Sequence, residues 1–165
     1  MSDFDPARER VAVIGGGSWG TAFAVLVATS GAAVSLLVRN PEQADAMRRQ
    51  RRNPRFLPEL ALPENIEIVD LGDGEALAEA TMVVCATPSR SAAQEAAMVA
   101  RHVRPGAGVQ NLAKGLDPSN GEPLSTTWKA ALGDDHPFCV LTGPNHAEEI
   151  SRGYPAASVV GGDPA

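Results

Sequence analysis

The sequence predicts an α/β fold, in which a mainly parallel sheet carries helices on both faces. Short apolar runs alternate with segments of helical pattern along the 165 residues, which is typical of this class. The strand-like runs are continuously apolar, as expected where both faces of a sheet are buried. A glycine cluster, Gly15-x-Gly17-x-x-Gly20, separates the first apolar run from the first helical segment. This arrangement indicates a Rossmann-like, doubly wound domain.

Each predicted strand is a short, mostly apolar run that follows a turn or a polar segment. The strands are expected at Val11–Ile14, Val34–Val38, Ile66–Val69, Met82–Ala86, Gly108–Leu112, Phe138–Thr142 and Ser158–Val160. Each predicted helix lies between two of these runs or follows one. The helices are expected at Trp19–Ser30, Pro41–Arg49, Gly74–Ala80, Arg90–His102, Glu122–Leu132 and Ala147–Arg152. Asn40 is the expected cap of the second helix, and Pro41 suits its first turn.

The remaining segments complete the expected domain, which takes in residues 1–165. The proline-rich stretch Arg52–Asn65 is expected to be an ordered, non-helical excursion before the third strand. The polar residues 1–9 are expected to form a flexible tail and show no apolar core of a signal peptide. No segment has the apolar length that is needed to span a bilayer, and we expect a cytoplasmic protein.

Charge and cysteine content exclude several function classes. The formal net charge of −6 gives no overall electrostatic support for a nucleic-acid partner. The two cysteines, Cys85 and Cys139, both lie in apolar runs. We therefore expect reduced, buried thiols and no metal site or disulfide.

The glycine cluster predicts a dinucleotide site. Gly15 permits the tight turn, Gly17 lets the backbone approach a pyrophosphate, and Gly20 lets the helix pack closely on the strand. The first-turn amides of the helix, near Ser18 and Trp19, would face the phosphates with the positive end of the helix dipole.

The choice of cofactor depends on the residues that follow the second strand. An acidic residue there would bind the ribose hydroxyls of NAD, but this chain has Val38-Arg39-Asn40. The Arg39 guanidinium can hold a 2′-phosphate in a bidentate fork, which favours NADP with NAD tolerated. Alternatively, Arg39 stacks on the adenine, which fits either cofactor.

Further candidates follow other strands, because ligands bind outside the carboxyl ends of the strands in open α/β sheets. Lys114 directly follows the fifth strand, where a cation can hold a substrate phosphate or polarise an oxygen. The loop after the fourth strand contains Pro88, which makes a turn rigid. In the loop after the sixth strand, Gly143 permits close backbone approach, and Asn145 can cap a helix or donate to an anion.

These motifs resemble those of the NAD(P)-dependent glycerol-3-phosphate dehydrogenases of bacterial type, and the match runs from Val11 to Gly161. The landmarks are Gly15-Gly-Gly-Ser-Trp-Gly-Thr-Ala22, Asn53-Pro-Arg-Phe-Leu-Pro58, Leu62-Pro-Glu-Asn65, Ala86-Thr-Pro-Ser89, Ala113-Lys-Gly115 and Gly143-Pro-Asn-His-Ala-Glu-Glu149. The resemblance implies hydride transfer between NAD(P)H and dihydroxyacetone phosphate, which gives sn-glycerol 3-phosphate for phospholipid synthesis.

The resemblance also implies roles for individual residues. Ser18, Trp19 and Arg39 look like dinucleotide contacts, with Asn40 beside them. Lys114 looks like a residue shared between cofactor and substrate. Gly143 and Asn145 look like substrate contacts, and Ala147 looks like a backbone contact near the nicotinamide. Phe56 would form a wall of the cleft. His146 stands where the family usually has an apolar residue, which argues against a catalytic role.

The length departs from the family pattern. Members are about twice as long and have an all-helical C-terminal domain, which is expected to carry the general acid/base lysine and a phosphate-binding arginine. The chain alone is therefore expected to bind dinucleotide with little or no turnover, and to self-associate, for example as a homodimer, through exposed apolar surface. The alternative from another class is a non-catalytic dinucleotide-binding sensor or regulatory module. Lys114 and Asn145, which a sensor does not need, favour the enzyme.

Overall fold

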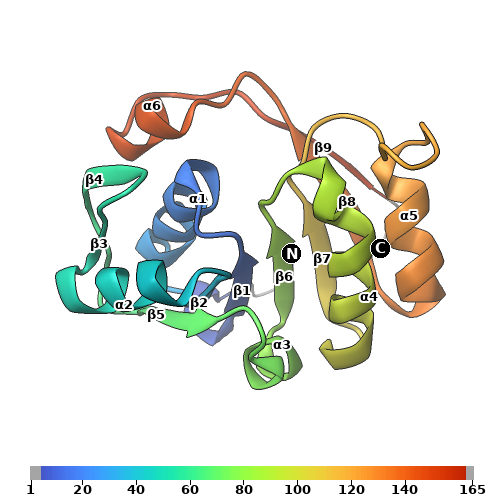
Figure 1. Cartoon of the computed structure of the whole chain (residues 1–165), viewed down its shortest axis with the longest axis horizontal. Coiled ribbons are helices and arrows are strands. Elements are labelled where there is room, and N and C mark those ends of the chain that lie inside the picture. Colours follow the sequence, from blue (N-terminus) through green and yellow to red (C-terminus); the bar gives the residue numbers. More distant parts are fainter. Residues whose placement is uncertain (1–4, 163–165) are drawn as a thin grey trace.

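The computed structural model describes residues 5–162, which form a seven-stranded sheet with helices on both faces (Figure 1). The strand order is β5-β2-β1-β6-β7-β8-β9. All neighbours in the sheet are parallel except β8 and β9, which are antiparallel. The expected doubly wound, mainly parallel fold is confirmed, and the order reverses direction between β1 and β6.

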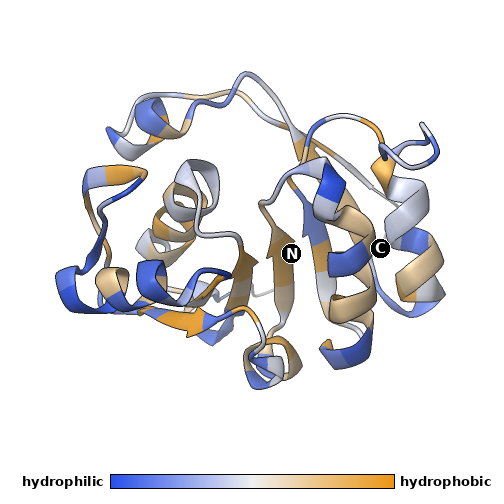
Figure 2. Cartoon of the chain, in the orientation of Figure 1, coloured by the Kyte–Doolittle hydropathy of each residue, from blue (hydrophilic) through white to orange (hydrophobic). Residues whose placement is uncertain are grey.

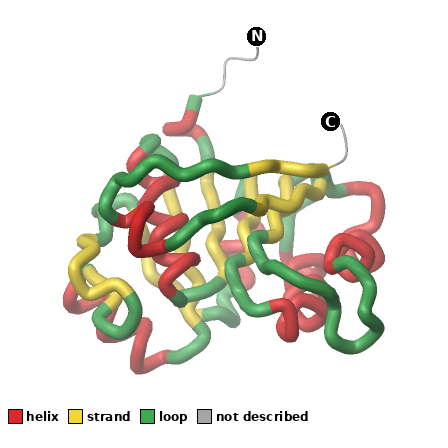
Figure 3. The backbone as a smooth tube through the Cα atoms, turned by 90° about the horizontal axis from the view of Figure 1, so that it is seen from above, coloured by secondary structure: helices red, strands yellow, loops and turns green. Residues whose placement is uncertain are grey.

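The strands agree with the expected runs to within two residues at each end. The main sheet contains β1 (Arg10–Ile14), β2 (Ala33–Val38), β5 (Ile66–Asp70), β6 (Met82–Cys85), β7 (Gly108–Asn111), β8 (Phe138–Thr142) and β9 (Val159–Gly162). Seen from above in Figure 3, the strands lie side by side, and loops connect their ends to the surrounding helices.

The helices also agree closely with expectation. They are α1 (Ser18–Thr29), α2 (Pro41–Gln50), α3 (Gly74–Glu79), α4 (Ala92–His102), α5 (Leu124–Leu132) and α6 (Ala147–Ser151). Asn40 caps α2 as expected, since its Oδ1 accepts from the Gln43 amide at 2.8 Å. Two helix starts were placed too early: Ser89–Ser91 form a separate 3-10 turn, and α5 begins after Pro123. None of the described helices is long and apolar enough to cross a membrane.

The proline-rich excursion is an antiparallel hairpin of β3 (Arg52–Asn53) and β4 (Leu57–Ala61), with a register shift between its two strands. It is ordered and non-helical, as expected. Of the expected tail, residues 1–4 lie outside the described residues, and Pro6–Arg8 form a 3-10 turn that Asp5 caps.

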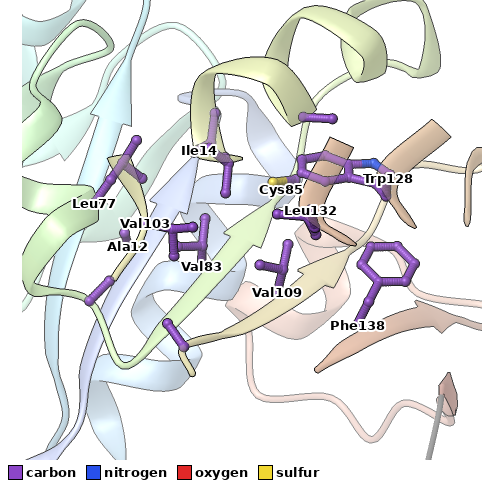
Figure 4. Close-up of a cluster of buried hydrophobic side chains, with 14 of the residues drawn as sticks. Ala12, Ile14, Leu77, Val83, Cys85, Val103, Val109, Trp128, Leu132 and Phe138 are labelled. Carbon is purple, nitrogen blue, oxygen red and sulfur yellow. The ribbon is translucent and has the colours of Figure 1, made fainter. Parts of the chain in front are cut away.

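Two apolar layers hold the helices against the sheet. On one face, Val13, Leu36 and Val84 pack with Phe23 of α1 and Met47 of α2. On the other face, α3, α4 and α5 cover the side chains shown in Figure 4, where Trp128 stacks on Phe138 with ring centroids 6.0 Å apart. In Figure 2, β1, β5 and β6 are largely apolar, whereas α2 and α4 carry hydrophilic residues. Because both faces are covered, the edge at the strand ends is left to bind ligands.

Candidate functional site

A cleft with a volume of about 780 Å³ lies at the carboxyl ends of the central strands. This volume is within the usual range for small-molecule and cofactor sites. It is lined by residues at or beyond the carboxyl ends of six strands, β1, β2, β5, β6, β7 and β8, and by the tip of the β3–β4 hairpin: Ile14, Gly15, Gly16, Gly17, Ser18, Trp19, Leu37, Val38, Arg39, Asn40, Gln43, Arg55, Phe56, Leu71, Ala86, Thr87, Pro88, Arg90, Glu95, Leu112, Ala113, Lys114 and Asn145. The topology therefore brings together most of the site residues that were named from the sequence.

The glycine turn forms the floor of this cleft. Gly15 has φ +127°, and a Cβ on it would lie 2.6 Å from the Ala86 carbonyl oxygen. A Cβ on Gly20 would collide with the Gly15 carbonyl, whereas one on Gly17 would meet no atom within 4 Å. Gly20 is thus needed for packing of α1 and does not line the cleft. Gly17 leaves an open backbone surface, which fits the approach of a pyrophosphate.

The N-terminus of α1 points its backbone donors at this surface. Gly17 is the N-cap and has no side chain to satisfy the first-turn amides, which begin at Ser18. These amides and the positive end of the helix dipole suit a phosphate group. The geometry of the turn therefore fits a dinucleotide.

A hydrogen-bond network that the sequence did not reveal fixes the glycine turn. Asn53 of β3 is fully buried, and its Nδ2 donates to the Gly16 carbonyl at 3.0 Å and to Thr21 Oγ1 at 2.8 Å. Gln43 of α2 also donates to the Gly16 carbonyl, at 2.5 Å. Hairpin, glycine turn and α2 are thereby held in one arrangement.

The expected cation, Arg39, directly follows β2. Arg39 and Asn40 both line the cleft, although the side chain of Asn40 is already used as the cap of α2. At the hairpin tip, the Arg55 guanidinium lies 5.2 Å from the ring centre of Phe56, which is 40% exposed. Phe56 thus forms part of the cleft wall.

A carboxylate that the sequence analysis did not single out also lines the cleft. Glu95, in the first turns of α4, is only 6% exposed and accepts a hydrogen bond from the Thr87 hydroxyl. Burial raises its pKa to about 7, although the hydrogen bond from Thr87 and the positive charge of Arg39 act in the opposite direction. An acidic residue in the first turns of a helix usually looks like a solvated surface group, so only the fold could place it here.

Of the substrate-side candidates, Lys114 and Asn145 line the cleft, and Gly143 lies outside the lining but is bonded to Lys114. Lys114 donates from Nζ to the Gly143 carbonyl at 3.0 Å. A Cβ on Gly143 would collide with the Ala157 carbonyl, so the backbone needs glycine here. Asn145 lines the cleft and donates from Nδ2 to Ser158 Oγ at 3.2 Å. It does not cap α6, because His146 is the N-cap residue.

Other named residues lie outside the cleft lining. Ala147 starts α6, is 7% exposed and packs against Ala22 and Leu57. His146 also does not line the cleft. Within residues 5–162, no group of three or more His, Cys, Asp or Glu residues could hold a metal ion.

Charge in the cleft differs in sign from that of the whole chain. Arg39, Arg55, Arg90 and Lys114 line it, and among residues 5–162 only Glu95 adds a carboxylate to the lining. The formal net charge of the chain is −6. The cleft is therefore suited to an anionic ligand that spans the glycine turn and Lys114.

Known proteins show the same organisation. The family described as the N-terminus of NAD-dependent glycerol-3-phosphate dehydrogenase matches residues 10–164. Glycerol-3-phosphate dehydrogenase (NAD(P)+) of Desulfitobacterium hafniense is 39% identical over 92% of this chain and 42% of its own length. The protein of the same name from Xanthomonas campestris is 37% identical over 98% of this chain and 47% of its own length. The chain thus spans about half the length of these curated relatives.

Solved structures agree with this match. The crystal structure of glycerol-3-phosphate dehydrogenase from Coxiella burnetii has a TM-score of 0.89 at 25% identity, over 96% of this chain and 48% of that one. The glycerol-3-phosphate dehydrogenase of Saccharomyces cerevisiae has a TM-score of 0.82 at 21% identity, over 95% of this chain and 48% of that one, and supports the fold alone.

Proposed function

The chain belongs to the NAD-dependent glycerol-3-phosphate dehydrogenase family, whose N-terminal domain it contains, and on this premise we propose that it binds NAD(P)H for hydride transfer to dihydroxyacetone phosphate. The observation that carries the proposal is the single cleft that joins an open glycine turn to Lys114. The product would be sn-glycerol 3-phosphate, a precursor for phospholipid synthesis. The predicted cytoplasmic location suits this role and stays a prediction.

The residues of the glycine turn would hold the pyrophosphate. The open backbone at Gly17 and the amides at the start of α1, at Ser18 and Trp19, face the cleft. A bound nicotinamide cofactor supplies the hydride, and the chain binds and orients it. Pro88, which also lines the cleft, would make the loop after β6 rigid.

Arg39 would set the cofactor preference. It lines the cleft at the end of β2, and the residue after it is the neutral Asn40. A guanidinium at this position can bind a 2′-phosphate through two hydrogen bonds. We therefore propose that NADP(H) is preferred and that NAD(H) is tolerated.

Lys114 would act on the substrate. Its ammonium is held by the Gly143 carbonyl, and Asn145 lies at the same end of the cleft. If a substrate oxygen replaced the Gly143 carbonyl as hydrogen-bond acceptor, Lys114 would stabilise the negative charge that develops on that oxygen as the substrate carbonyl is reduced. The backbone at Ala147, where α6 begins, would support the nicotinamide end. A module that only senses dinucleotide has no use for this assembly.

The binding proposal is tested by calorimetric titration of the chain with NADPH and with NADH. We expect both to bind, with NADPH the tighter ligand. Arg39→Ala is expected to weaken NADPH binding by about tenfold to a hundredfold, since a charge-assisted bond contributes about 1.5–3 kcal/mol, and to change NADH binding much less. Arg8→Ala is the matched control, because Arg8 lies outside the cleft. Failure of both dinucleotides to bind would contradict the proposal.

Turnover is expected to need more than this chain. A hydride donor works only when the substrate is held in place and a proton donor is aligned with its carbonyl. By resemblance, those groups belong to the helical domain. We expect little or no steady-state oxidation of NADPH with dihydroxyacetone phosphate, and a sustained rate by this chain alone would refute this expectation.

A further inference from the structure

Glu95 is the one carboxylate among the described residues that line the dinucleotide cleft. It belongs to α4, is 6% exposed, and has a hydrogen bond from Thr87 Oγ1. Neither the glycine turn nor the Lys114 region uses it. A nearly buried ionisable group in a binding cleft calls for a functional explanation.

Glu95 shares the cleft with two arginines. Arg39, which directly follows β2, lines the same cleft, and its positive charge favours the ionised Glu95 carboxylate. Burial, and to a lesser extent the charge of Glu95, raises the pKa of the buried Cys85 thiol of β6. Arg90, from the 3-10 turn before α4, lines the same cleft. Burial outweighs the hydrogen bond from Thr87 and the charge of Arg39 and raises the pKa of Glu95 to about 7, so that both protonation states are populated near neutral pH.

The two states would treat the two cofactors differently. An ionised carboxylate near Arg39 competes with a 2′-phosphate for the guanidinium and repels the phosphate charge. The same carboxylate can accept a hydrogen bond from a ribose hydroxyl. A neutral Glu95 carboxyl does not repel the 2′-phosphate and does not compete with it for the Arg39 guanidinium. The end of β2 lacks the usual acidic residue, and the fold brings one in from α4.

We propose that Glu95 opposes Arg39 in cofactor selection, so that the preference for NADP(H) over NAD(H) decreases when the Glu95 carboxyl ionises. This inference rests on the proposed function, since it assumes that the cleft binds both dinucleotides. It assigns Glu95 as a specificity-determining residue. The chain would thus prefer the phosphorylated cofactor under slightly acidic conditions and discriminate less under slightly alkaline ones.

Ionisation of the ligand has the opposite effect. A phosphate monoester loses its second proton with a pKa of about 6. Its charge therefore becomes more negative with rising pH, which strengthens binding to Arg39. A preference for NADPH that falls with pH cannot come from the ligand.

The test measures the dissociation constants of NADPH and NADH between about pH 6.5 and 8.5, above the second pKa of the phosphate. In the unmodified chain, the ratio of NADPH to NADH affinity is expected to fall by about tenfold over this range. In Glu95→Gln, which keeps an acceptor for Thr87, the ratio is expected to stay high throughout. Glu67→Gln is the matched control, because Glu67 is exposed and lines a different cavity, and it should behave like the unmodified chain.

A second variant changes Thr87, the residue that donates a hydrogen bond to the Glu95 carboxylate. Thr87→Val removes the hydrogen bond that stabilises the ionised form. The fall in preference is therefore expected to move to higher pH. Circular dichroism shows whether each variant is folded.

Two kinds of failure can be distinguished. If the folded chain binds neither dinucleotide at any pH, the proposed function is wrong and the inference fails with it. If both dinucleotides bind, but the ratio of NADPH to NADH affinity does not fall with pH or falls equally in Glu95→Gln, only the inference about Glu95 is overturned. The proposed function then stands.

Discussion

Glu95 also makes the stability of the domain depend on pH. Its pKa is about 7 in the folded chain, against 4.5 as the ordinary value. Between these values the folded state binds more protons than the unfolded state, so stability falls as the pH rises toward and through 7. The shift corresponds to a loss on the order of 3 kcal/mol in free energy of unfolding above pH 7.

Glu95→Gln should remove this dependence, because the amide does not titrate. From pH 5 to pH 8.5, the unmodified chain is expected to lose about 3 kcal/mol in free energy of unfolding that the variant does not lose. Urea denaturation of both proteins at the two pH values measures this difference. A pH-independent effect of the amide on stability is the same at both pH values and drops out of the comparison. An equal pH response of the two proteins would show that Glu95 titrates normally.

Individual site residues differ in how far the sequence could reveal them. Gly15, Gly17 and Arg39 stand at fixed positions relative to a strand and its following helix, so local pattern was enough to place them at the cleft. Glu95 and Asn53 could not be placed in this way. Glu95 shares the cleft with Arg39, and Asn53 donates to Thr21, so both positions depend on residues that are distant in sequence.

At the scale of elements, the β3–β4 hairpin supports the glycine turn. The hydrogen bonds from Asn53 to Gly16 and Thr21 connect the hairpin to the glycine turn and to the first turn of α1. A turn held from outside the glycine motif keeps its backbone donors in one direction without the ligand. Pre-organisation of this kind reduces the entropy lost on binding.

Asn53→Ala is therefore expected to lower both stability and dinucleotide affinity. Loss of two buried hydrogen bonds should reduce the free energy of unfolding by about 2–3 kcal/mol. Asn65→Ala is the matched control: Asn65 donates from Nδ2 to the carbonyls of Ala28 and Ala32, at 2.9 and 2.7 Å, and does not line the cleft. Denaturation should show the larger loss of stability for Asn53→Ala, because Asn53 is buried and Asn65 is exposed, and calorimetry should show weaker binding for Asn53→Ala only. Equal affinities of the two folded variants would argue against the supporting role.

The sequence predicted the strands and helices of the main sheet well, because buried parallel strands are continuous apolar runs. It did not predict that the proline-rich excursion pairs as a hairpin. β3 has two residues and β4 contains Pro58, so neither shows a clear strand pattern. It also did not give the antiparallel direction of β9, which depends on how the chain returns after α6.

At the scale of the whole molecule, charge is separated along the strand direction. Cations line the cleft at the carboxyl ends of the strands. A second cavity, of about 470 Å³, includes the starts of β1 and β2 in its lining, together with Arg10 and five acidic residues: Glu64, Glu67, Asp73, Glu75 and Glu79. An approaching anion would therefore be steered toward the carboxyl ends, despite the net charge of −6.

The edge of the sheet predicts self-association of the chain. β9 is the last strand in the sheet, and its Val159 and Val160 are 66% and 58% exposed. An exposed apolar edge strand readily pairs with another copy. Sedimentation at rising concentration is expected to show a dimer, and Val159→Lys should weaken it.

Leu116→Lys is the control for this surface. Leu116 is 57% exposed but belongs to the loop between β7 and α5, so it should not affect association. A chain that remains monomeric at high concentration would contradict the prediction.

The positions of the two tryptophans give the molecule an optical reporter of its own. Trp19 is half-buried and lines the cleft at the start of α1. Trp128, in α5, is fully buried in the apolar core (Figure 4). A dinucleotide in the cleft would alter the emission of Trp19, and unfolding would alter that of Trp128. Intrinsic fluorescence can thus follow ligand occupancy and integrity of the core in one sample without an added dye.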